Sequence, residues 1–578
     1  MELLSSPQSF PTLIATATQV LTTYDILERI VCLDVLDRQD MINCAVVCRL
    51  GSDLALDELW SHSTFDALLR ILPCASYKMD SGHREWSVVD NFLSIAHWDR
   101  FFFYSKRVKT IEAICFVGPP INLKISDRML REMSFSRPDY TLFPNLRKLS
   151  WEGDGFDTDT WIKFSRIFLQ TSLSDLSISF FDEEIIADFI SDIPARAPYL
   201  SSLRIAVLEF EQPESSVWSL LGLTKILPLL HNLVKLSSQC DATKPESVRA
   251  IAKLPRLSSL RLGLYSQEQD FVLLIDTENP FPSLTLLEIF RGRTRCITQL
   301  LNKVSNKQAL TSLEVSVIDY TELALEAFVQ NLQSACPALQ YLTIFQDKED
   351  RPVFADSLEL AREAIPSLPR TMLAFLMGLR ELKRLHVTYY RSSEMTDDDF
   401  IELIAALPNL TELKLICIPT TTERPALTLS VLHRLSDFYH SRPKHARLTN
   451  LQLQVDALIW SNETIDALLS SADIYELDSL DVLSFSASPV SSIDNTALYL
   501  SHMIPPKTKL ITNALDHESL PLGSTPEGNE DHEFDVKEME DRRANWSEVR
   551  ERIKVFRRMQ SILARRKAQN RVVMLLPN

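Results

Sequence analysis

The sequence is poor in glycine, with 11 glycines among 578 residues. Neither of the glycine-rich strings that cradle phosphate groups, GxxxxGK[ST] and GxGxxG, occurs in it. The strings GxSxG and HExxH are absent as well, and no cysteine and histidine stand in a recognisable catalytic setting. We therefore expect a protein that is not an enzyme and that uses no cofactor and no metal ion.

Paired cysteines and long apolar runs are also missing. The nine cysteines are scattered, without a CxxC string or a histidine at zinc-binding spacing, which is typical of a reducing compartment. Cys44 and Cys48, four residues apart in an apolar segment, are interpreted as small core residues. The first residues lack a positively charged leader region, and no apolar run approaches the roughly 20 residues that span a bilayer. These features predict a cytoplasmic or nuclear protein without a membrane span.

The sequence has fewer basic than acidic residues. It contains 60 Lys and Arg and 77 Asp and Glu, which gives a formal net charge of −17. A nucleic-acid-binding protein neutralises phosphates with clustered Lys and Arg. The acidic balance therefore argues against a nucleic-acid partner, although a local basic segment exists near the C-terminus.

Leucine, by contrast, recurs in a fixed pattern, L-x-x-L-x-[LIV], between residues 111 and 490. In this pattern the last two apolar residues are two apart, the strand period, so both point into a core. The copies begin 24 to 43 residues apart, mostly at or near the leucine-rich-repeat period, with first leucines at Leu146, Leu173, Leu200, Leu233, Leu257, Leu284, Leu310, Leu339, Leu382, Leu410, Leu448 and Leu480.

Amphipathic segments lie between these strands, at residues 158–170, 182–193, 245–254, 321–336 and 396–407. The last one opens with Thr396 followed by Asp397 and Asp398, which suit the start of a helix better than a catalytic carboxylate pair. A strand–helix unit cannot bury its leucines alone, so neighbours must stack. The sequence thus predicts an α/β repeat fold, a horseshoe-shaped leucine-rich-repeat solenoid of about 12 to 13 repeats.

The outward residues of the strands are a candidate binding surface. Solenoid proteins bind partners along such a sheet, and aromatic and Arg residues are typical of interface hot spots. We predict a target-binding surface formed by Arg261, Phe290, Tyr341, Phe345, Arg384, His386 and Tyr390. The alternative is that an error in register turns these residues into the core, or that inserted loops cover them.

Residues 21–62, which follow a flexible segment at 1–20, contain three short apolar stretches at helical spacing. Ile26 and Leu27 belong to the first, Met41 and Ile42 to the second and Leu54 to the third. Helices this short bury little area. We expect the unit to complete its core against a partner or against the adjacent repeats.

This unit resembles the F-box in the strings DILERI, LDRQDM, VVCR and ALDELW. The layout as a whole resembles fungal F-box proteins with leucine-rich repeats that end in a basic helix and a tail like RVVMLLP. Three departures fall in the adaptor-binding surface. The family usually has Pro where Tyr24 stands and Trp where Gly51 stands, and the segment between Ile30 and Leu36 is two residues longer than usual.

The resemblance implies a Skp-type adaptor and a cullin ligase as partners, with the chain a monomer within the hetero-complex. It implies that the adaptor face or its support is formed by Asp25, Ile26, Leu27, Ile30, Leu36, Met41, Val47 and Cys48. The implied function is that of a non-catalytic substrate-recognition subunit of a Skp–cullin–F-box ubiquitin ligase. Two alternatives stay open: a repeat scaffold or inhibitor without a ligase, whose helices merely cap the solenoid, and an enzyme with an unrecognised site.

Three further segments complete the expected organisation. Residues 63–110 are expected to be a helical linker or N-terminal cap of the repeats, and residues 491–541 a terminal repeat remnant followed by an acidic flexible linker. Residues 542–578 predict a basic amphipathic helix with Trp546, Val549 and Ile553 on its apolar stripe. Such a helix could bind membranes, calmodulin or nucleic acid. We favour a capping helix packed on the last repeat.

Overall fold

In the computed structural model the chain forms two compact units. The first is Met1–Leu262 with Ile275–Pro282, and the second is Gly263–Leu274 with Ser283–Asn578. The residues that the structure describes are 23–31, 36–47, 49–72, 75–80, 83–88, 95–114, 122–125, 131, 133–135, 141–152, 166–180, 183–207, 221–241, 245–264, 275, 277–318, 322–346, 370–389, 393–417, 424–458, 477–485, 488–511 and 530–574. The predicted flexible segment 1–20 lies outside them.

The first unit is built on a sheet whose strands follow one another almost in chain order. Neighbouring strands of this sheet run parallel from its first strand, at His62–Ser63, to the strand at Lys235–Asp241. The sheet order is β1 (His62–Ser63), β4 (Thr110–Ile114), β6 (Lys148–Glu152), β7 (Asp175–Phe180), β8 (Ser202–Val207), β9 (Lys235–Asp241) and β10 (Ser259–Leu264). Its connecting helices are η1 (Arg166–Phe168), α9 (Glu183–Arg196), α10 (Leu221–Ile226), η2 (Leu227–Leu229) and α11 (Pro245–Ala252).

A helical module precedes this sheet in the first unit. Its helices are α2 (Tyr24–Val31), α3 (Arg38–Val47) and α4 (Arg49–Ser61), which share one apolar core. Helices α5 (Phe65–Leu69) and α6 (Ile95–Ser105) follow, with a separate small sheet of β2 (Ala75–Asp80), β3 (His83–Val88) and β5 (Asn122–Ile125). The expected helical linker at 63–110 is therefore wrong in part, because strands β2 and β3 also fall there.

The second unit continues the same plan with strands that all run parallel. Their order is β11 (Leu286–Gly292), β12 (Ser312–Val317), β13 (Tyr341–Gln346), β14 (Arg384–Tyr389), β15 (Glu412–Cys417), β16 (Asn450–Gln452), β17 (Val482–Ser484) and β18 (Lys509–Ile511). The helices are α12 (Thr294–Lys303), α13 (Glu322–Ala335), α15 (Arg370–Leu376), α16 (Asp397–Ala406), α17 (Val431–Ser441), α19 (Ile493–Met503) and α20 (Glu530–Met574).

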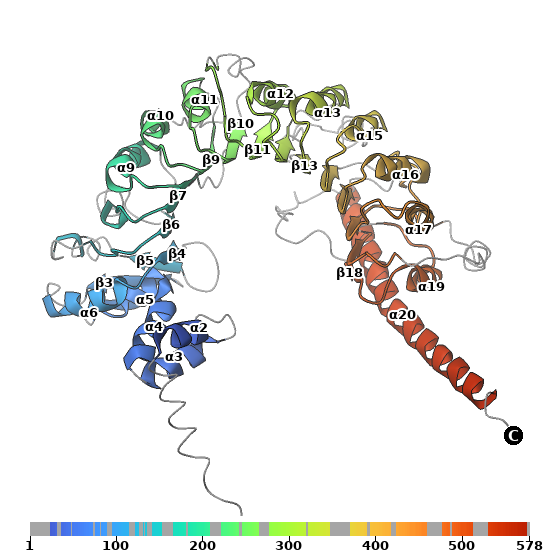
Figure 1. Ribbon diagram of the computed structural model, residues 1–578, viewed down its shortest axis with the longest axis horizontal. Coiled ribbons are helices and arrows are strands. Elements are labelled where there is room, and N and C mark those ends of the chain that lie inside the picture. Colours follow the sequence, from blue (N-terminus) through green and yellow to red (C-terminus); the bar gives the residue numbers. More distant parts are fainter. Residues whose placement is uncertain are drawn as a thin grey trace, which may run out of the picture. The chain divides into compact units, whose positions relative to one another are not determined.

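In each unit the connecting helices line one face of the sheet and leave the other face to the outward strand residues (Figure 1). The leucines of the repeated pattern fill the space between strands and helices. Leu176, Leu203, Leu313, Leu385 and Leu413, for example, are each at most 1% exposed. Burial of one such side chain contributes about 1.5–3 kcal/mol. The α/β class, the parallel open sheet and a solenoid-like repeat thus agree with the sequence analysis.

A ladder of hydroxyl groups runs beside the leucine ladder. The residue just after the first leucine of a repeat is often Ser or Thr, and its Oγ donates to a carbonyl of the preceding repeat. Ser201 Oγ donates to Ser174 O at 2.9 Å, Thr411 Oγ1 to Lys383 O at 3.0 Å and Thr449 Oγ1 to Thr411 O at 3.2 Å. The backbone N–H of the same residue points to the same carbonyl, as in Thr411, at 2.8 Å. Each hydroxyl therefore satisfies polar backbone at the start of a strand.

The end of the second unit differs from the sequence expectation in extent. Strand β18 and helix α19 add a further strand and helix after residue 490, where only a remnant was expected. Helix α20 begins at Glu530, so the described part of the predicted acidic flexible linker is helical. The helix expected at 158–170 is described only for Arg166–Phe168, as a short 3-10 turn, and residues 158–165 lie outside the described residues.

Candidate functional site

The predicted target-binding residues on β13 and β14 lie on the strand face opposite the buried leucines. The parallel register places Tyr341 beside Arg384, and Arg384 beside Glu412. One pair further along, Thr343 neighbours His386, which neighbours Lys414. Asn450 of β16 extends the first row beyond Glu412. Because side chains of one strand alternate between faces, these residues share the outward face.

The Glu412 carboxylate is the centre of this cluster. It accepts a hydrogen bond from Arg384 Nε at 2.6 Å and lies 2.8 Å from Lys414 Nζ and 3.0 Å from His386 Nε2. Asn450 Nδ2 donates to its other oxygen, Oε1, at 3.2 Å. The Glu412 side chain is only 15% exposed, whereas that of Arg384 is 47% exposed. The carboxylate therefore holds two cationic side chains in fixed places on an open face.

The charges around Glu412 set the protonation of the cluster. Burial, the positive charge of Lys414 and that of Arg384 lower the pKa of His386 to about 4, against the opposing effect of Glu412. Burial alone would raise the pKa of Glu412, but the hydrogen bond and charge of Lys414, with His386 and Arg384, hold it below its ordinary value. At neutral pH the histidine is neutral and the glutamate is ionised.

Aromatic side chains flank the charged cluster. The Arg384 guanidinium lies over the Tyr341 ring, 5.2 Å from its centroid, an arrangement that attracts a cation to a ring face. Phe345 stands further along β13 and is 37% exposed. Phe290 lies on β11 next to a shift in the register with β12. Flat, rigid aromatic surface beside an arginine is suited to binding another protein.

Phe290 lies on β11, two strands away from β13, and two further members of the predicted surface do not join this cluster either. Arg261 lies on β10 in the first unit, within Met1–Leu262. Tyr390 lies outside the described residues. The structure therefore brings together Tyr341, Arg384 and His386 as expected, and it adds Glu412, Lys414 and Asn450. These three residues alternate with buried leucines along β15 and β16, so the strand period accounts for the face on which they lie. The strand period does not show that one carboxylate would contact the others.

The predicted adaptor residues divide into core and surface. Leu27 and Met41 are buried in the core of the helical module, and Leu36 packs partly against it. Asp25 and Ile26 are exposed, Ile26 by 42%. Cys48 lies outside the described residues, as do the side chains of the other two predicted residues, Ile30 and Val47.

The module also exposes apolar side chains that were not among the predicted adaptor residues. On α3, Val46 is 82% exposed and Ile42, one helical turn earlier, is 43% exposed. Tyr24 in the first turn of α2 is 48% exposed. The sequence groups Met41, Ile42 and Val46 on one apolar stretch, and only the packing separates the buried residue from the two exposed ones. Contiguous exposed apolar surface is typical of sites that bind partners, and Ile42 and Val46 contribute such surface on α3.

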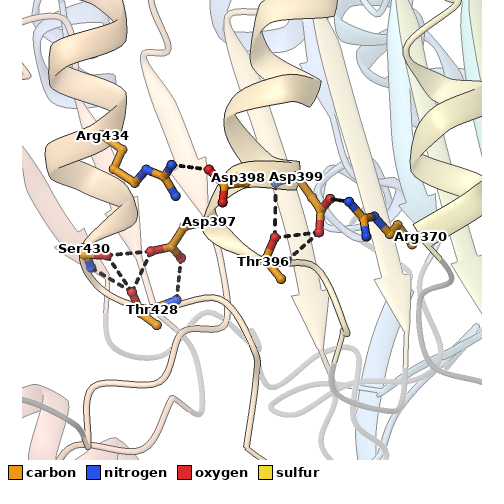
Figure 2. A network of polar contacts seen from close by, with 8 residues as sticks. All are labelled: Arg370, Thr396, Asp397, Asp398, Asp399, Thr428, Ser430 and Arg434. Atoms are coloured by element: carbon orange, nitrogen blue, oxygen red, sulfur yellow. Dashed lines mark hydrogen bonds and ion pairs between the residues drawn. The ribbon is translucent and has the colours of Figure 1, made fainter.

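The aspartates at the start of α16 serve the structure of the helix (Figure 2). Thr396 and Asp399 form a capping box: Thr396 Oγ1 accepts from Asp399 N at 3.3 Å, and Asp399 Oδ2 accepts from Thr396 N at 3.0 Å. Arg370 lies 2.6 Å from the nearly buried Asp399 carboxylate. Burial would raise the pKa of Asp399, but the Thr396 hydrogen bonds and Arg370 outweigh it and lower that pKa.

Asp397 joins the starts of two successive helices, α16 and α17 (Figure 2). Its Oδ1 accepts from Thr428 N at 2.8 Å, and its Oδ2 accepts from Thr428 Oγ1 at 2.7 Å and Ser430 Oγ at 2.5 Å. The adjacent Asp398 pairs with Arg434 of α17 at the surface. Every carboxylate of this group is held by neighbouring side chains, which agrees with a helix-starting role for Asp397 and Asp398.

Within the described parts of the chain, no three His, Cys, Asp or Glu side chains are grouped so that they could hold a metal ion. No helix among the described residues combines the length and the apolar character needed to cross a membrane. Cys44, Cys296 and Cys336, all within the described ranges, are not joined in disulfide bonds. Burial raises the pKa of Cys336 to about 12, so this thiol is protonated at neutral pH.

The fold and the site together define an α/β repeat protein with an exposed strand face. No protein-family model matches the chain, and no curated protein matches it. Among solved structures, a chain of the "Structure of the Toll - Spatzle complex, a molecular hub in Drosophila development and innate immunity" is similar at 12% identity, with a TM-score of 0.26. The similarity covers 72% of this chain and 53% of that chain, so this protein spans about half the length of that neighbour. A likeness this distant carries no argument about function.

Proposed function

We propose that this chain is a leucine-rich-repeat solenoid that holds a target protein for a Skp–cullin–F-box ubiquitin ligase. One observation carries the target-binding half of the proposal, the cluster around Glu412 on the open strand face. Glu412 fixes Arg384 on one side, and Arg384 covers Tyr341 on the other. Side chains held in place before binding lose little conformational freedom when a partner arrives, so more of the contact energy appears as affinity.

The adaptor-binding half rests on the F-box resemblance and on the exposed apolar residues of α3. Leu27, Met41 and Leu54 form the core of the module, and Ile42 and Val46 are left at the surface. An adaptor with an apolar groove would cover both side chains. Tethering the target near the ubiquitin-conjugating enzyme then raises its effective concentration, and the chemistry belongs to the partner enzymes.

A second candidate function is a repeat scaffold or inhibitor that never meets a ligase. Two residues of the module favour it. Gly51, which stands where the F-box family usually has Trp, is buried in α4 and offers no ring to an adaptor. Tyr24, in place of the usual Pro, is part of the first turn of α2.

Co-purification of the full chain with a Skp-type adaptor separates these functions. We expect a complex with the wild-type chain at micromolar concentration. Ile42→Asp combined with Val46→Asp should abolish it, because two charges would enter an apolar interface. The matched control is Gln39→Asp, an exposed residue of the same helix, which should leave binding unchanged. Absence of a complex with the wild-type chain would contradict the ligase role and favour the scaffold.

A further inference from the structure

The strand face of the first unit differs in chemistry from the cluster around Glu412. Its first row of outward residues runs across the strands through Lys148, Asp175, Ser202 and Lys235, which are neighbours in register. Ser259 continues this row, because its N–H donates to Val234 O just as that of Lys235 donates to Ser201 O. This row therefore holds two lysines, one aspartate and two serines.

The second row lies two residues further along each strand. It runs through Ser150, Ser177, Arg204 and Ser237, again neighbours in register. Arg261 follows Ser259 by two residues on β10 and so continues this row next to Ser237. We call the two rows together the serine face. Most of its residues are serines with short hydroxyl side chains, and its longer, cationic side chains are those of Lys148, Arg204, Lys235 and Arg261.

The charge of the serine face is opposite to that of the whole chain. It carries these four cations and one carboxylate, that of Asp175, in a protein with a net charge of −17. Arg204 and Lys235 are both exposed. Neither forms an ion pair with another described residue. Arg384 and Lys414, on the strand face of the second unit, are by contrast both paired with Glu412. Arg204 and Lys235 therefore keep their positive charge available for a partner.

The spacing of the cations matches an extended polypeptide. Neighbouring strands lie about 4.8 Å apart, so Arg204 and Arg261, two strands apart, stand about 10 Å from each other at their Cα atoms. Lys148 and Lys235, three strands apart, are separated by about 14 Å on the same basis. An extended chain advances about 3.3 Å per residue, so carboxylates three or four residues apart would reach successive cations. Serine side chains are short enough to let its backbone approach the sheet.

We propose that the serine face binds an extended, acidic segment of the target protein, with carboxylates or phosphates about three residues apart. This inference deepens the proposed function and rests on it, because it names the chemistry of the target. Neither row offers an aromatic ring on which a base could stack, and single-stranded nucleic acids depend on such rings. A protein segment therefore fits this face better than a polynucleotide does.

Fluorescence anisotropy with labelled peptides tests this assignment on the full chain. The probes are a 12-residue peptide of four Glu-Gly-Ser units, its Gln-Gly-Ser counterpart and a version with phosphoserine in place of Glu. We expect the Glu peptide to bind and the Gln peptide not to bind. The Arg204→Glu, Lys235→Glu variant should bind the Glu peptide at least about tenfold more weakly, since attraction becomes repulsion at two positions.

The control variant is Arg558→Glu, Arg565→Glu, which makes the same change of charge on exposed residues of α20 and should bind like the wild type. Tighter binding of the phosphoserine peptide assigns phosphate as the natural anion, and equal binding assigns carboxylate. Equal losses in both variants, binding of the Gln peptide, or displacement by a single-stranded oligonucleotide at lower concentration than by the peptide would overturn the inference. If the wild-type chain binds the adaptor but not the peptide, the assignment of the serine face is refuted and the ligase role is not. If it binds the peptide but forms no complex with the adaptor, the ligase role is refuted and the assignment of the serine face is not.

Discussion

Replacing Asp397 with alanine should loosen the start of α17 from the start of α16. The carboxylate accepts three hydrogen bonds, from Thr428 N, Thr428 Oγ1 and Ser430 Oγ, all between 2.5 and 2.8 Å. These contacts join the helices of two successive repeats, so their loss weakens the stacking of one repeat on the next rather than one helix alone.

The size of the effect follows from the kind of bond. A hydrogen bond to a charged group contributes about 1.5–3 kcal/mol, but the three donors here are half-buried and water can replace part of the loss. We therefore expect a total of about 2–3 kcal/mol, less than the sum of the three bonds. Since each 1.4 kcal/mol is a factor of ten, local opening should become roughly 30- to 140-fold more frequent.

Hydrogen exchange followed by mass spectrometry measures this opening directly. Peptides that cover residues 424–441 should exchange faster by that factor in the Asp397→Ala variant, while peptides from the first unit stay unchanged. Asp397→Asn should recover most of the protection, because its amide oxygen still accepts from Thr428 N. Asp398→Ala is the control, since its ion pair with Arg434 is a surface contact worth at most about 1 kcal/mol.

Two results would refute this reasoning. The first is that peptides 424–441 exchange at the same rate in the Asp397→Ala and Asp398→Ala variants. The protection would then come from the effect that both aspartates share on the helix dipole, and not from the hydrogen bonds between repeats. If neither variant differs from the wild type, the network has no part in holding α17.

Three further predictions concern other parts of the chain. Burial and nearby cations lower the pKa of His386 to about 4, so the unfolded chain binds a proton that the folded chain lacks, and stability falls as pH drops from about 6.5 to 4. In the His386→Asn variant, the free energy of unfolding should fall by about 1–2 kcal/mol less between pH 7 and pH 4 than in the wild type, after allowance for partial exposure. Urea unfolding of the second unit at the two pH values measures the difference. Trp546→Ala should free α20 from the segment between β17 and α19, at a cost of about 3–5 kcal/mol. The Trp546 ring is 2% exposed, its centroid lies 4.9 Å from that of Phe485, and its Nε1 donates to Ser488 O. Hydrogen exchange of residues 541–560 measures the change. Arg107→Met should cost the first unit about 1–2 kcal/mol, because its guanidinium bonds two carboxylates of α4, and thermal unfolding measures the change.

Much of the fold could be predicted because the spacing of the leucines marks where each strand lies. Two apolar residues in alternation mark a strand, and the predicted pairs, such as Leu342 with Ile344 and Leu413 with Leu415, are buried in parallel strands. The hydroxyl ladder could not be predicted in the same way. A Ser or Thr after a leucine fits many structures, and its role depends on a carbonyl about one repeat earlier in the chain.

The errors at both ends of the repeat have physical causes. Strand β1 has only two residues, His62 and Ser63, and so carries no apolar alternation that a pattern could detect. At the other end, the acidic composition of residues 515–541 favours a flexible linker, yet its described part belongs to α20. Glu, Lys, Arg and Met are good helix formers, and Trp546 anchors the helix further along.

For the candidate site, the sequence predicted which residues share the outward strand face, but not which side chains contact one another. Alternation along β13 and β14 puts Tyr341, Arg384 and His386 on one face, and the structure brings them together. Glu412 was missed as the centre because its role depends on how far long side chains reach across strands. Ile42 and Val46 were missed for a related reason, since only packing decides which part of an apolar helix face is left at the surface.

The most direct test of the account is proximity labelling in cells, with the full chain and with two variants. If the proposed function is right, two surfaces act separately: the helical module binds the adaptor, and the strand faces bind the target. The Ile42→Asp, Val46→Asp variant should lose labelling of the adaptor and cullin and keep the target. The Arg204→Glu, Lys235→Glu variant should lose a target and keep the adaptor and cullin. Identical sets of labelled proteins for the wild-type chain and both variants would contradict it.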